Sequence, residues 1–200
     1  MLNASLLTCR RGGRLVFENA GFVLAKAGLL LVTGHNGCGK SSLLRVLAGL
    51  LPFEKGQILW DGNAVGDFTE HRRRLRYIGH LDALKPELTV GETLAYWSLL
   101  FGTGRPGESA QVIGLEEKKN TPVRFLSAGQ KRRLALARFL LGEVPLWLMD
   151  EPTTSLDEQG RTLFFKLISG HRAKGGMAII ATHEINDFTD GRQLAMDRKA

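Results

Sequence analysis

The eight residues GHNGCGKS, from Gly34 to Ser41, constrain the fold of this chain more than any other stretch. They follow the aliphatic run Leu29–Val32 and lead into a helical pattern. The G-x-x-x-x-G-K-S spacing between a strand and a helix fits the phosphate-binding loop. Its glycines let successive backbone N–H groups turn inward, and the helix N-terminus adds partial positive charge. The stretch therefore predicts a site for a nucleoside triphosphate.

The side chains of this loop have separate predicted tasks. Lys40 is expected to reach the β- and γ-phosphates, and Ser41 to place its hydroxyl on Mg²⁺. The strand and the helix on either side speak against a chance glycine-rich connection. The residues expected to contact ATP here are Gly34, His35, Asn36, Gly37, Cys38, Gly39, Lys40, Ser41 and Ser42.

Hydrolysis also needs a carboxylate for the metal and a base that orients water, and one hydrophobic run supplies both. Leu146–Met149 is typical of a buried strand, and Asp150 and Glu151 follow it directly. We expect Asp150 beside Mg²⁺ and Glu151 polarising the attacking water, both with catalytic Lys40 nearby. A strand that ends in surface acids is the alternative interpretation.

Composition and patterning predict the fold class. The chain has 200 residues, of which 44% are hydrophobic and 24% charged, and this suits one compact domain with a sizeable core. Short apolar runs alternate with helical patterns, which predicts an α/β domain with a largely parallel sheet. Strand-like runs resume after residue 125, so we assign the ATPase core to 1–80 and 126–200 and a helical insertion to 81–125.

Local patterns predict individual elements. Thr89-x-x-Glu92 has the spacing of a capping box before a helix. Gly102–Gly107 is expected to be a loop, because it carries three glycines and a proline. Helices are expected at 41–50, with Leu43, Leu44, Leu47 and Leu50 on one face, and at 93–101; strands are expected at 16–24 around a turn at 18–21, and at 29–32, 58–60, 77–78, 146–149 and 177–181.

Composition also limits location and partners. The apolar runs fall far short of the roughly 20 residues needed to cross a bilayer, and the first residues lack a basic leader. Only Cys9 and Cys38 occur, so reduced, cytoplasm-like surroundings are expected rather than a disulfide framework. The net charge of +7 admits nucleic acid, but the basic run at 71–76 has no interleaved aromatics and is typical of a solvated face. No nucleic-acid partner is expected.

The stretch Leu126–Arg138 combines a capping motif with an unfavourable charge pattern. Ser127-x-x-Gln130 has capping-box spacing, and three basic residues follow at 131–133. Positive charge opposes the helix dipole at this end. An anion from a second nucleotide site would explain the pattern; a capped surface helix with solvated basic side chains is the alternative.

Together these residues resemble the ATP-binding cassette (ABC) family, and the resemblance covers essentially the whole chain. In that family the LSGGQ signature of one subunit contacts the γ-phosphate held by the other; here it reads LSAGQ, with Ala128 in place of a glycine. The resemblance implies a P-loop NTPase core of ABC type, with a mostly parallel sheet, N-terminal antiparallel strands and an inserted helical subdomain. It also implies a homodimer.

The same resemblance assigns roles to further residues. Ser127, Gly129 and Gln130 of the signature, and Asp157 of the D-loop, are expected to contact ATP. His183, after the strand at 177–181, matches the catalytic switch histidine.

At two positions the chain departs from the ABC pattern. His80 stands where most members have a glutamine that senses the γ-phosphate and the metal, so we expect His80 in that catalytic and metal-binding place. Near the N-terminus, where the family stacks an aromatic ring on adenine, Arg11 is expected to lay its guanidinium plane on the base.

Three longer stretches, YIGHLDALKPELTVGETLAYW, PVRFLSAGQKRRLALARFLL and PLWLMDEPTTSLD, resemble the ATP-binding subunits of cytochrome c maturation systems, often described as haem exporters. This resemblance implies a peripheral subunit at the cytoplasmic face of a bacterial inner membrane, with integral-membrane transporter subunits as partners. None of the five histidines indicates haem binding. The expected docking surface is the helical insertion, chiefly 81–89, with the apolar residues Leu94, Tyr96, Trp97, Leu99, Leu100 and Phe101, which core packing explains equally well.

Other functional classes remain as alternatives. The chain suits the ATPase of another ABC transporter, or a soluble ABC-type ATPase that acts on nucleic acid, although such proteins usually carry paired cassettes or long insertions. A phosphate-loop kinase is the third class, and the signature motif and Glu151 speak against it.

Overall fold

The computed structural model describes residues 1–102, 105–188 and 190–196, and the chain forms two compact units. Unit 1 comprises Met1–Tyr77, Val144–Glu151 and the described part of Gly170–Ala200, and unit 2 comprises Ile78–Glu143 and Pro152–Ser169. The segment 81–125 falls within unit 2, together with residues on both sides of it. Its assignment as an insertion into a single domain stays a prediction.

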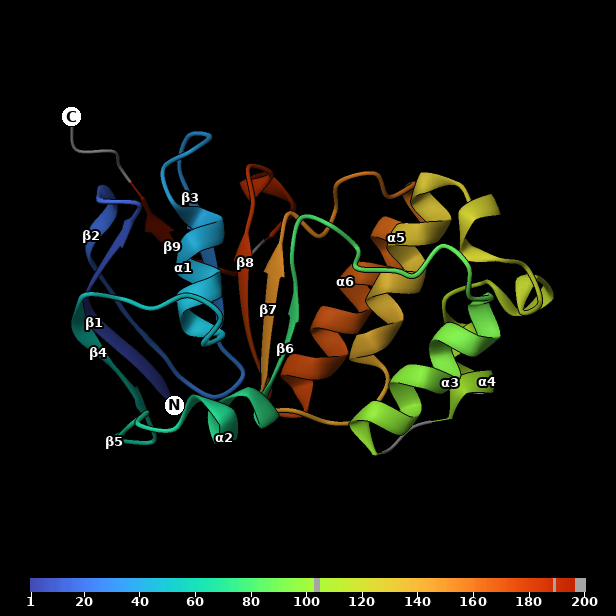
Figure 1. Ribbon diagram of the computed structural model, residues 1–200, viewed down its shortest axis with the longest axis horizontal. Helices are drawn as coiled ribbons and strands as arrows, with labels where there is room; N and C mark the ends of the chain where they lie inside the picture. The colour runs from blue at the N-terminus through green and yellow to red at the C-terminus, as the bar shows by residue number, and fades with distance from the viewer. Residues whose placement is uncertain (103–104, 189, 197–200) are drawn as a thin grey trace. The chain divides into compact units, whose positions relative to one another are not determined.

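A largely parallel five-stranded sheet belongs to unit 1, apart from Ile78 at the end of one strand, and its order is β6-β7-β8-β3-β9 (Figure 1). β8 pairs in parallel with both β7 and β3, and β9 pairs in parallel with β3. β3, β7 and β8 are buried at every position, which is typical of parallel strands. The predicted α/β class is confirmed. The strands are β3 (Leu29–Thr33), β6 (Leu75–Ile78), β7 (Leu146–Asp150), β8 (Met177–Ala181) and β9 (Arg192–Ala195).

Unit 1 also contains an antiparallel sheet of order β2-β1-β4-β5. Gly12 and Gly13 both adopt positive φ and connect the first two strands in a tight turn. The turn predicted at 18–21 is wrong, because β2 continues through it; Asn19 alone takes a φ of 53°, where the register with β1 shifts. The strands are β1 (Leu2–Arg11), β2 (Arg14–Leu24), β4 (Lys55–Trp60) and β5 (Asn63–Ala64).

One hydrophobic core includes residues of both sheets and of α1 (Lys40–Leu47). Leu43, Leu44 and Leu47 are fully buried in it, as predicted. Leu50 is 56% exposed, so its predicted place on the same face is wrong. The helix ends at Leu47, and Gly49 takes a left-handed φ of 66° that turns the chain away.

The elements of unit 2 are helical. The predicted capping box is confirmed at α3, where the side chains of Thr89 and Glu92 each accept from the other's backbone N–H. A second core of aliphatic side chains, with Trp97, fills this unit. The elements are α3 (Val90–Phe101), α4 (Pro106–Val112), α5 (Ala128–Leu136), the part of α6 (Glu158–Ala173) up to Ser169, and short 3₁₀ turns at Glu116–Lys118, Val123–Phe125 and Ala137–Phe139.

The predicted loop Gly102–Gly107 is only partly correct. Gly102 ends α3 in a left-handed conformation, and residues 103 and 104 lie outside the described residues. Pro106 begins α4, so the prediction is wrong for the last two positions. Proline suits the first turn of a helix, where its missing N–H leaves no intrahelical bond unmade.

No helix within the described ranges has both the length and the apolar character that crossing a membrane requires. Cys9 and Cys38 are both buried and are free thiols.

α2 (Phe68–Arg73) buries a histidine in unit 1. His71 is 2% exposed, its ring meets Trp60 edge-on, and its Nε2 lies 2.9 Å from the carbonyl oxygen of Leu47, to which it donates. Burial lowers the pKa of His71, and the nearby charge of Arg74 adds to this, against the opposing effect of the Leu47 hydrogen bond. The folded protein therefore favours the neutral ring.

We expect acid to destabilise the protein through His71. Because the pKa of this ring is lower in the folded chain, the unfolded chain binds more protons once the pH falls below about 6.5, and stability is lost from there toward the folded pKa. His71→Gln keeps a donor for Leu47 without a titrating ring. The melting temperature between about pH 7.5 and pH 5 should fall more steeply for the wild type than for the variant. An equal fall in melting temperature for the two proteins would contradict the neutral state assigned to buried His71.

Candidate active site

The phosphate-binding loop lies in unit 1 between the end of β3 and the start of α1. Gly34, Gly37 and Gly39 adopt φ values of 136°, 83° and 106°, which only glycine takes readily. Gly39 is the N-cap of α1 and provides no side-chain cap, and the first turn of the helix carries no acidic residue. The first backbone amides of α1 are thus left without capping groups, as they are at helix N-termini that bind anions.

Two of these glycines are also required by space. A Cβ on Gly34 would lie 2.4 Å from the carbonyl oxygen of Met196 and 2.7 Å from Cys38 Sγ, and one on Gly39 would lie 3.2 Å from the Phe17 side chain. At Gly37 no atom lies within 4 Å of that position. The loop is therefore packed closely against its own unit at both ends and is open at Gly37.

Lys40 is held inside this loop. It is 7% exposed, and its ammonium group donates to the carbonyl oxygens of Gly34 at 2.9 Å and His35 at 3.3 Å. A third contact joins Lys40 Nζ to His183 Nε2 at 3.0 Å. The cation therefore lies beside the backbone amides that would bind a phosphate.

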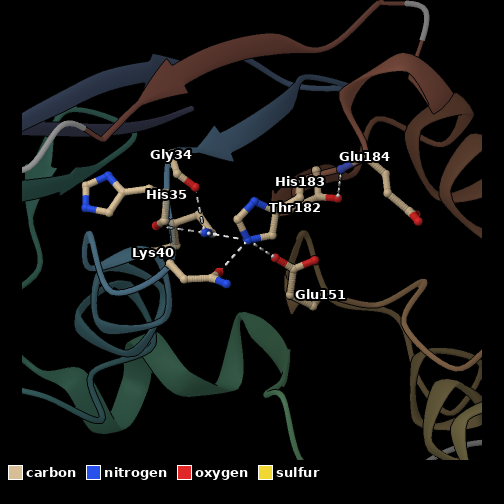
Figure 2. A network of polar contacts seen from close by, with 8 residues as sticks. Gly34, His35, Lys40, Glu151, Thr182, His183 and Glu184 are labelled. Carbon is tan, nitrogen blue, oxygen red and sulfur yellow. Dashed lines mark hydrogen bonds and ion pairs between the residues drawn. The ribbon is translucent and has the colours of Figure 1, made fainter.

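His183 is the centre of a polar network, shown in Figure 2. Besides Lys40, its Nε2 lies 2.8 Å from Asn36 Oδ1 and 3.4 Å from Glu151 Oε1. One ring nitrogen cannot accept from an ammonium and donate to two oxygens at once, so these contacts compete for the same atom. The network brings four predicted site residues from the loop and the ends of β7 and β8 to one point.

Glu151 follows β7 in a conformation that places its carboxylate in this network. Its φ is 48°, which is uncommon for a residue with a side chain, and its N–H donates to the carbonyl of Ala181 at 2.9 Å. Burial raises the pKa of Glu151, while the charges of His183 and Lys40 lower it. A raised pKa makes a carboxylate a better general base near neutral pH.

Asp150 and Ser41 are the two residues of this unit that are predicted to hold Mg²⁺. Asp150 ends β7 and is 1% exposed, and Ser41 follows Lys40 in α1. Within the described part of the chain, no three His, Cys, Asp or Glu side chains are grouped to hold a metal. One carboxylate and one hydroxyl suit Mg²⁺ that takes its other ligands from water and phosphate. The residues fit a metal that arrives with the nucleotide.

Unit 2 holds the predicted signature and D-loop residues together. Ser127 Oγ accepts from the N–H of Gln130 at 3.2 Å, and Gln130 Oε1 accepts from the N–H of Ser127 at 3.0 Å, so the predicted capping box is confirmed. A Cβ on Gly129 would lie 3.2 Å from the Ser155 carbonyl oxygen and 3.8 Å from Asp157 Cγ. The first turn of α5 therefore packs against the segment that contains Asp157.

The basic residues of α5 are bonded inside unit 2. Arg132 is 3% exposed; it donates to the Pro152 carbonyl at 3.1 Å and pairs with Asp82 at 2.8 Å. Arg133 pairs with Asp157 at 3.6 Å. The solvated-face interpretation is therefore wrong for these two arginines, because protein oxygens lie beside their guanidinium groups. The anion from a second nucleotide stays a prediction.

Two predicted site residues have exposed side chains. Arg11 is the last residue of β1, in unit 1. His80 lies in unit 2, after Gly79, whose carbonyl oxygen accepts from Arg132 at 3.4 Å. The stacking role of Arg11 and the metal-sensing role of His80 stay predictions.

Comparisons with known proteins agree with this geometry. A family model described as ABC transporter matches residues 17–154. The chain belongs to the ABC transporter family. A solved structure described as an ATP-binding subunit of an ABC transporter is 26% identical, with a TM-score of 0.83, and the match covers 94% of this chain and 81% of that one. The chain is thus an ATP-binding subunit of the family.

Two curated relatives are more similar. The cytochrome c biogenesis ATP-binding export protein CcmA of Paramagnetospirillum magneticum is 44% identical, and the match covers 99% of this chain and 94% of the relative. The protein of the same name from Rhodospirillum rubrum is 45% identical over 97% of this chain and 84% of the relative. These matches support the narrower resemblance seen in the sequence.

The ABC signature tolerates its alanine here. Ala128 is the first residue of α5 and is not among the residues with positive φ, so its Cβ meets no backbone penalty. Sequence reasoning missed two features of the site region: the contact of Asn36 with His183, and the pairing of Arg132 with Asp82. The basic residues at 131–133 indicated that Arg132 needs a negative partner, but no pattern in the sequence indicated Asp82.

Proposed function

We propose that this chain is the ATP-hydrolysing subunit of a membrane ABC transporter that serves c-type cytochrome biogenesis, in a haem export or haem-chaperone release complex. The observation that carries the enzymatic part is the convergence of Lys40, His183 and Glu151 beside the phosphate-binding loop. The biological part is supported by the names of relatives that match nearly the whole chain.

In the proposed mechanism, the loop binds the triphosphate before any chemistry occurs. Backbone amides of the loop and the first turn of α1 bind the phosphate oxygens. Lys40 exchanges the carbonyl oxygens of Gly34 and His35 for the β- and γ-phosphates. Ser41 and Asp150 would hold Mg²⁺, and the metal would supply positive charge to the phosphates. ATP binding therefore removes one of the three groups that compete for His183.

Hydrolysis then depends on Glu151 and His183. Glu151 accepts a proton from the attacking water, and its raised pKa suits that task. His183, once Lys40 has moved to the phosphates, is free to orient Glu151 and the γ-phosphate. We place His80 at the metal, as in the glutamine position of the family, and Arg11 on the base.

The catalytic form is proposed to be a homodimer that closes over two ATP molecules. Ser127, Gly129 and Gln130 of one copy contact the γ-phosphate held by the other, with Asp157 beside them. The packing of Gly129 against Ser155 and Asp157 supports a signature and D-loop that act as one surface. Phosphate charge that bridges the two copies drives the closure.

The membrane partner is proposed to dock on unit 2. Leu81, Leu99 and Leu100 are 80%, 84% and 62% exposed, which is unusual for large apolar side chains. Leu94 and Trp97, also predicted for this surface, are 1% and 7% exposed and belong to the core, so the docking prediction is wrong for them. The subunit is thereby peripheral, at the cytoplasmic face of the inner membrane.

The proposal is tested with Glu151→Gln, which removes the base but keeps the shape of the side chain. Purified from membranes in the presence of MgATP, the variant should retain ATP, form a dimer and carry an integral-membrane partner. The matched control is Glu117→Gln, which makes the same change at an exposed glutamate of unit 2. This variant should release its nucleotide. A variant recovered repeatedly as a monomer without nucleotide would contradict the proposal, and salt-sensitive RNA binding would favour the nucleic-acid class.

A further inference from the structure

Two arginines of unit 2 bind one segment, Gly79–Lys85, which contains His80 and is here called the His80 segment. Arg132, from α5, reaches it through Nη1, which lies 2.8 Å from Asp82 Oδ1 and 3.4 Å from the Gly79 carbonyl oxygen. Through Nε the same guanidinium donates to the carbonyl oxygen of Pro152 at 3.1 Å. Pro152 directly follows Glu151 in the chain. A single side chain thus joins the signature helix, the His80 segment and the residue after the proposed base.

Arg138 binds the other side of the same aspartate. Its Nη2 donates to the backbone carbonyl of Asp82, and its guanidinium lies 4.7 Å from the centre of the Trp97 ring in α3. Burial lowers the pKa of Arg138 to about 10, while the Asp82 carboxylate acts in the opposite direction. The buried Arg132 and the partly buried Arg138 therefore both lie beside Asp82, and removing one partner of a buried ion pair is costly.

The His80 segment also contacts α3 farther along. Lys85 Nζ lies 5.2 Å from the centre of the Tyr96 ring. Ala83, next to Asp82, takes a left-handed φ of 51°, which a residue with a side chain adopts only where its surroundings impose it. Tyr96 is 46% exposed and neighbours the apolar side chains Leu99 and Leu100 of the proposed docking surface. The arginines thus connect that surface with the start of the signature helix through continuous contacts.

We propose that Asp82 is a positioning residue that, through Arg132 and Arg138, sets the His80 segment and the signature helix in register for ATP-driven dimer closure. This inference rests on the proposed function, because it assigns a regulating part to the same reaction. Asp82 is proposed to act through these two arginines rather than on the nucleotide itself. Its side chain is 26% exposed and its carboxylate pairs with Arg132 of α5, whose side chain is 4% exposed, while its backbone carbonyl accepts from Arg138.

The test uses Asp82→Asn in the Glu151→Gln background, with dimer formation titrated against MgATP by analytical ultracentrifugation. Asparagine keeps the shape and removes the charge that balances the two arginines. We expect the dimer to be at least about tenfold weaker, because contacting charged residues couple at this level. Binding of a fluorescent ATP analogue to the monomer depends on the loop in unit 1, so its Kd should change by less than about twofold. A tenfold change in Kd would need about 1.4 kcal/mol.

Two further measurements distinguish the proposed positioning role of Asp82 from a merely structural role. Amide exchange of Gly79–Lys85 should rise in Asp82→Asn at temperatures where the melting curve shows the protein folded. In the presence of active Glu151, kcat should fall at least about fivefold with little change in KM, the sign of an interaction made only in the closed state. Arg138→Met, which keeps apolar volume over Trp97, should show the same pattern more weakly. The control is Glu117→Gln, which neutralises an exposed carboxylate of the same unit, and it should leave all these values unchanged.

The outcomes are distinguishable. If Glu151→Gln dimerises with ATP and Asp82→Asn weakens that dimer while the monomer still binds the analogue, the inference stands. Equal dimerisation with and without Asp82 overturns the inference and leaves the proposed function intact. Failure of Glu151→Gln itself to dimerise overturns the proposed function, and the positioning role with it.

Discussion

Replacing Lys40 by alanine is expected to lower MgATP turnover by about 100- to 1000-fold, the effect of removing one preorganised donor from a transition state. Lys40 is the cation placed beside the loop amides, with its ammonium within 3.0 Å of both the Gly34 carbonyl oxygen and His183 Nε2. The alanine variant retains the glycines and the start of α1, but it loses the positive charge that follows the γ-phosphate through the reaction. Phosphate release from the purified protein measures the change.

The matched control is Lys55→Ala, which removes an exposed lysine from β4 of the same unit. Its turnover should stay within about twofold of the wild type, because an exposed charge away from the loop contributes little. The melting temperature of Lys40→Ala should remain close to that of the wild type, since Asn36 and Glu151 still contact His183. Turnover by Lys40→Ala at the wild-type rate would contradict the assignment of the loop.

The sequence predicts the parts of this protein whose cause is local. The loop Gly34–Ser41 is specified by glycines in conformations that other residues avoid, and β3, β7 and β8 by apolar runs that parallel strands require. The capping boxes at Thr89 and Ser127 depend on residues three apart. In each case the neighbours in the chain contain the whole physical reason, and the structure confirms the prediction.

Features that depend on distant residues were missed. β9 is short and mostly exposed, so it shows no apolar run, and its position is fixed by pairing with β3 more than 150 residues earlier in the chain. The family resemblance implied antiparallel strands near the N-terminus, but no local pattern gave the bounds of β1, because its partners are β2 and β4 and its register is irregular. Leu50 was misplaced because one left-handed glycine ends the helical periodicity.

The same difference between local and distant causes applies to the candidate site. Motif spacing identified Lys40, Asp150 and Glu151, and the family resemblance added His183; the structure brings Lys40, Glu151 and His183 into one network. Spacing did not indicate that Lys40, Asn36 and Glu151 compete for a single nitrogen of His183. The contacts of Asp82 with Arg132 and Arg138 were also not predicted, because a run of charges has the same sequence pattern whether it is solvated or paired.

Replacing His183 by alanine is expected to lower kcat for MgATP by about 100-fold or more, the usual contribution of a well-placed acid–base or orienting group. His183 Nε2 lies 3.0 Å from Lys40 Nζ and 3.4 Å from Glu151 Oε1, so one ring orients both the cation and the base. The backbone of this region does not depend on the ring, because the Thr182 N–H donates to Val32 of β3. Steady-state kinetics with the purified protein measures the loss.

The division of this loss between kcat and KM identifies the role of the ring. If His183 acts on Glu151 and the γ-phosphate after ATP has bound, the alanine variant lowers kcat and leaves KM nearly unchanged. If its main role is instead to hold Lys40 in the loop before ATP binds, its removal frees the cation and lowers KM. Glu184→Gln is the control, because Figure 2 shows the Glu184 side chain directed away from the network, and its kinetics should match the wild type. A His183→Ala enzyme with unchanged kcat would show that Glu151 is oriented without the ring, and that the competition for its Nε2 has no part in hydrolysis.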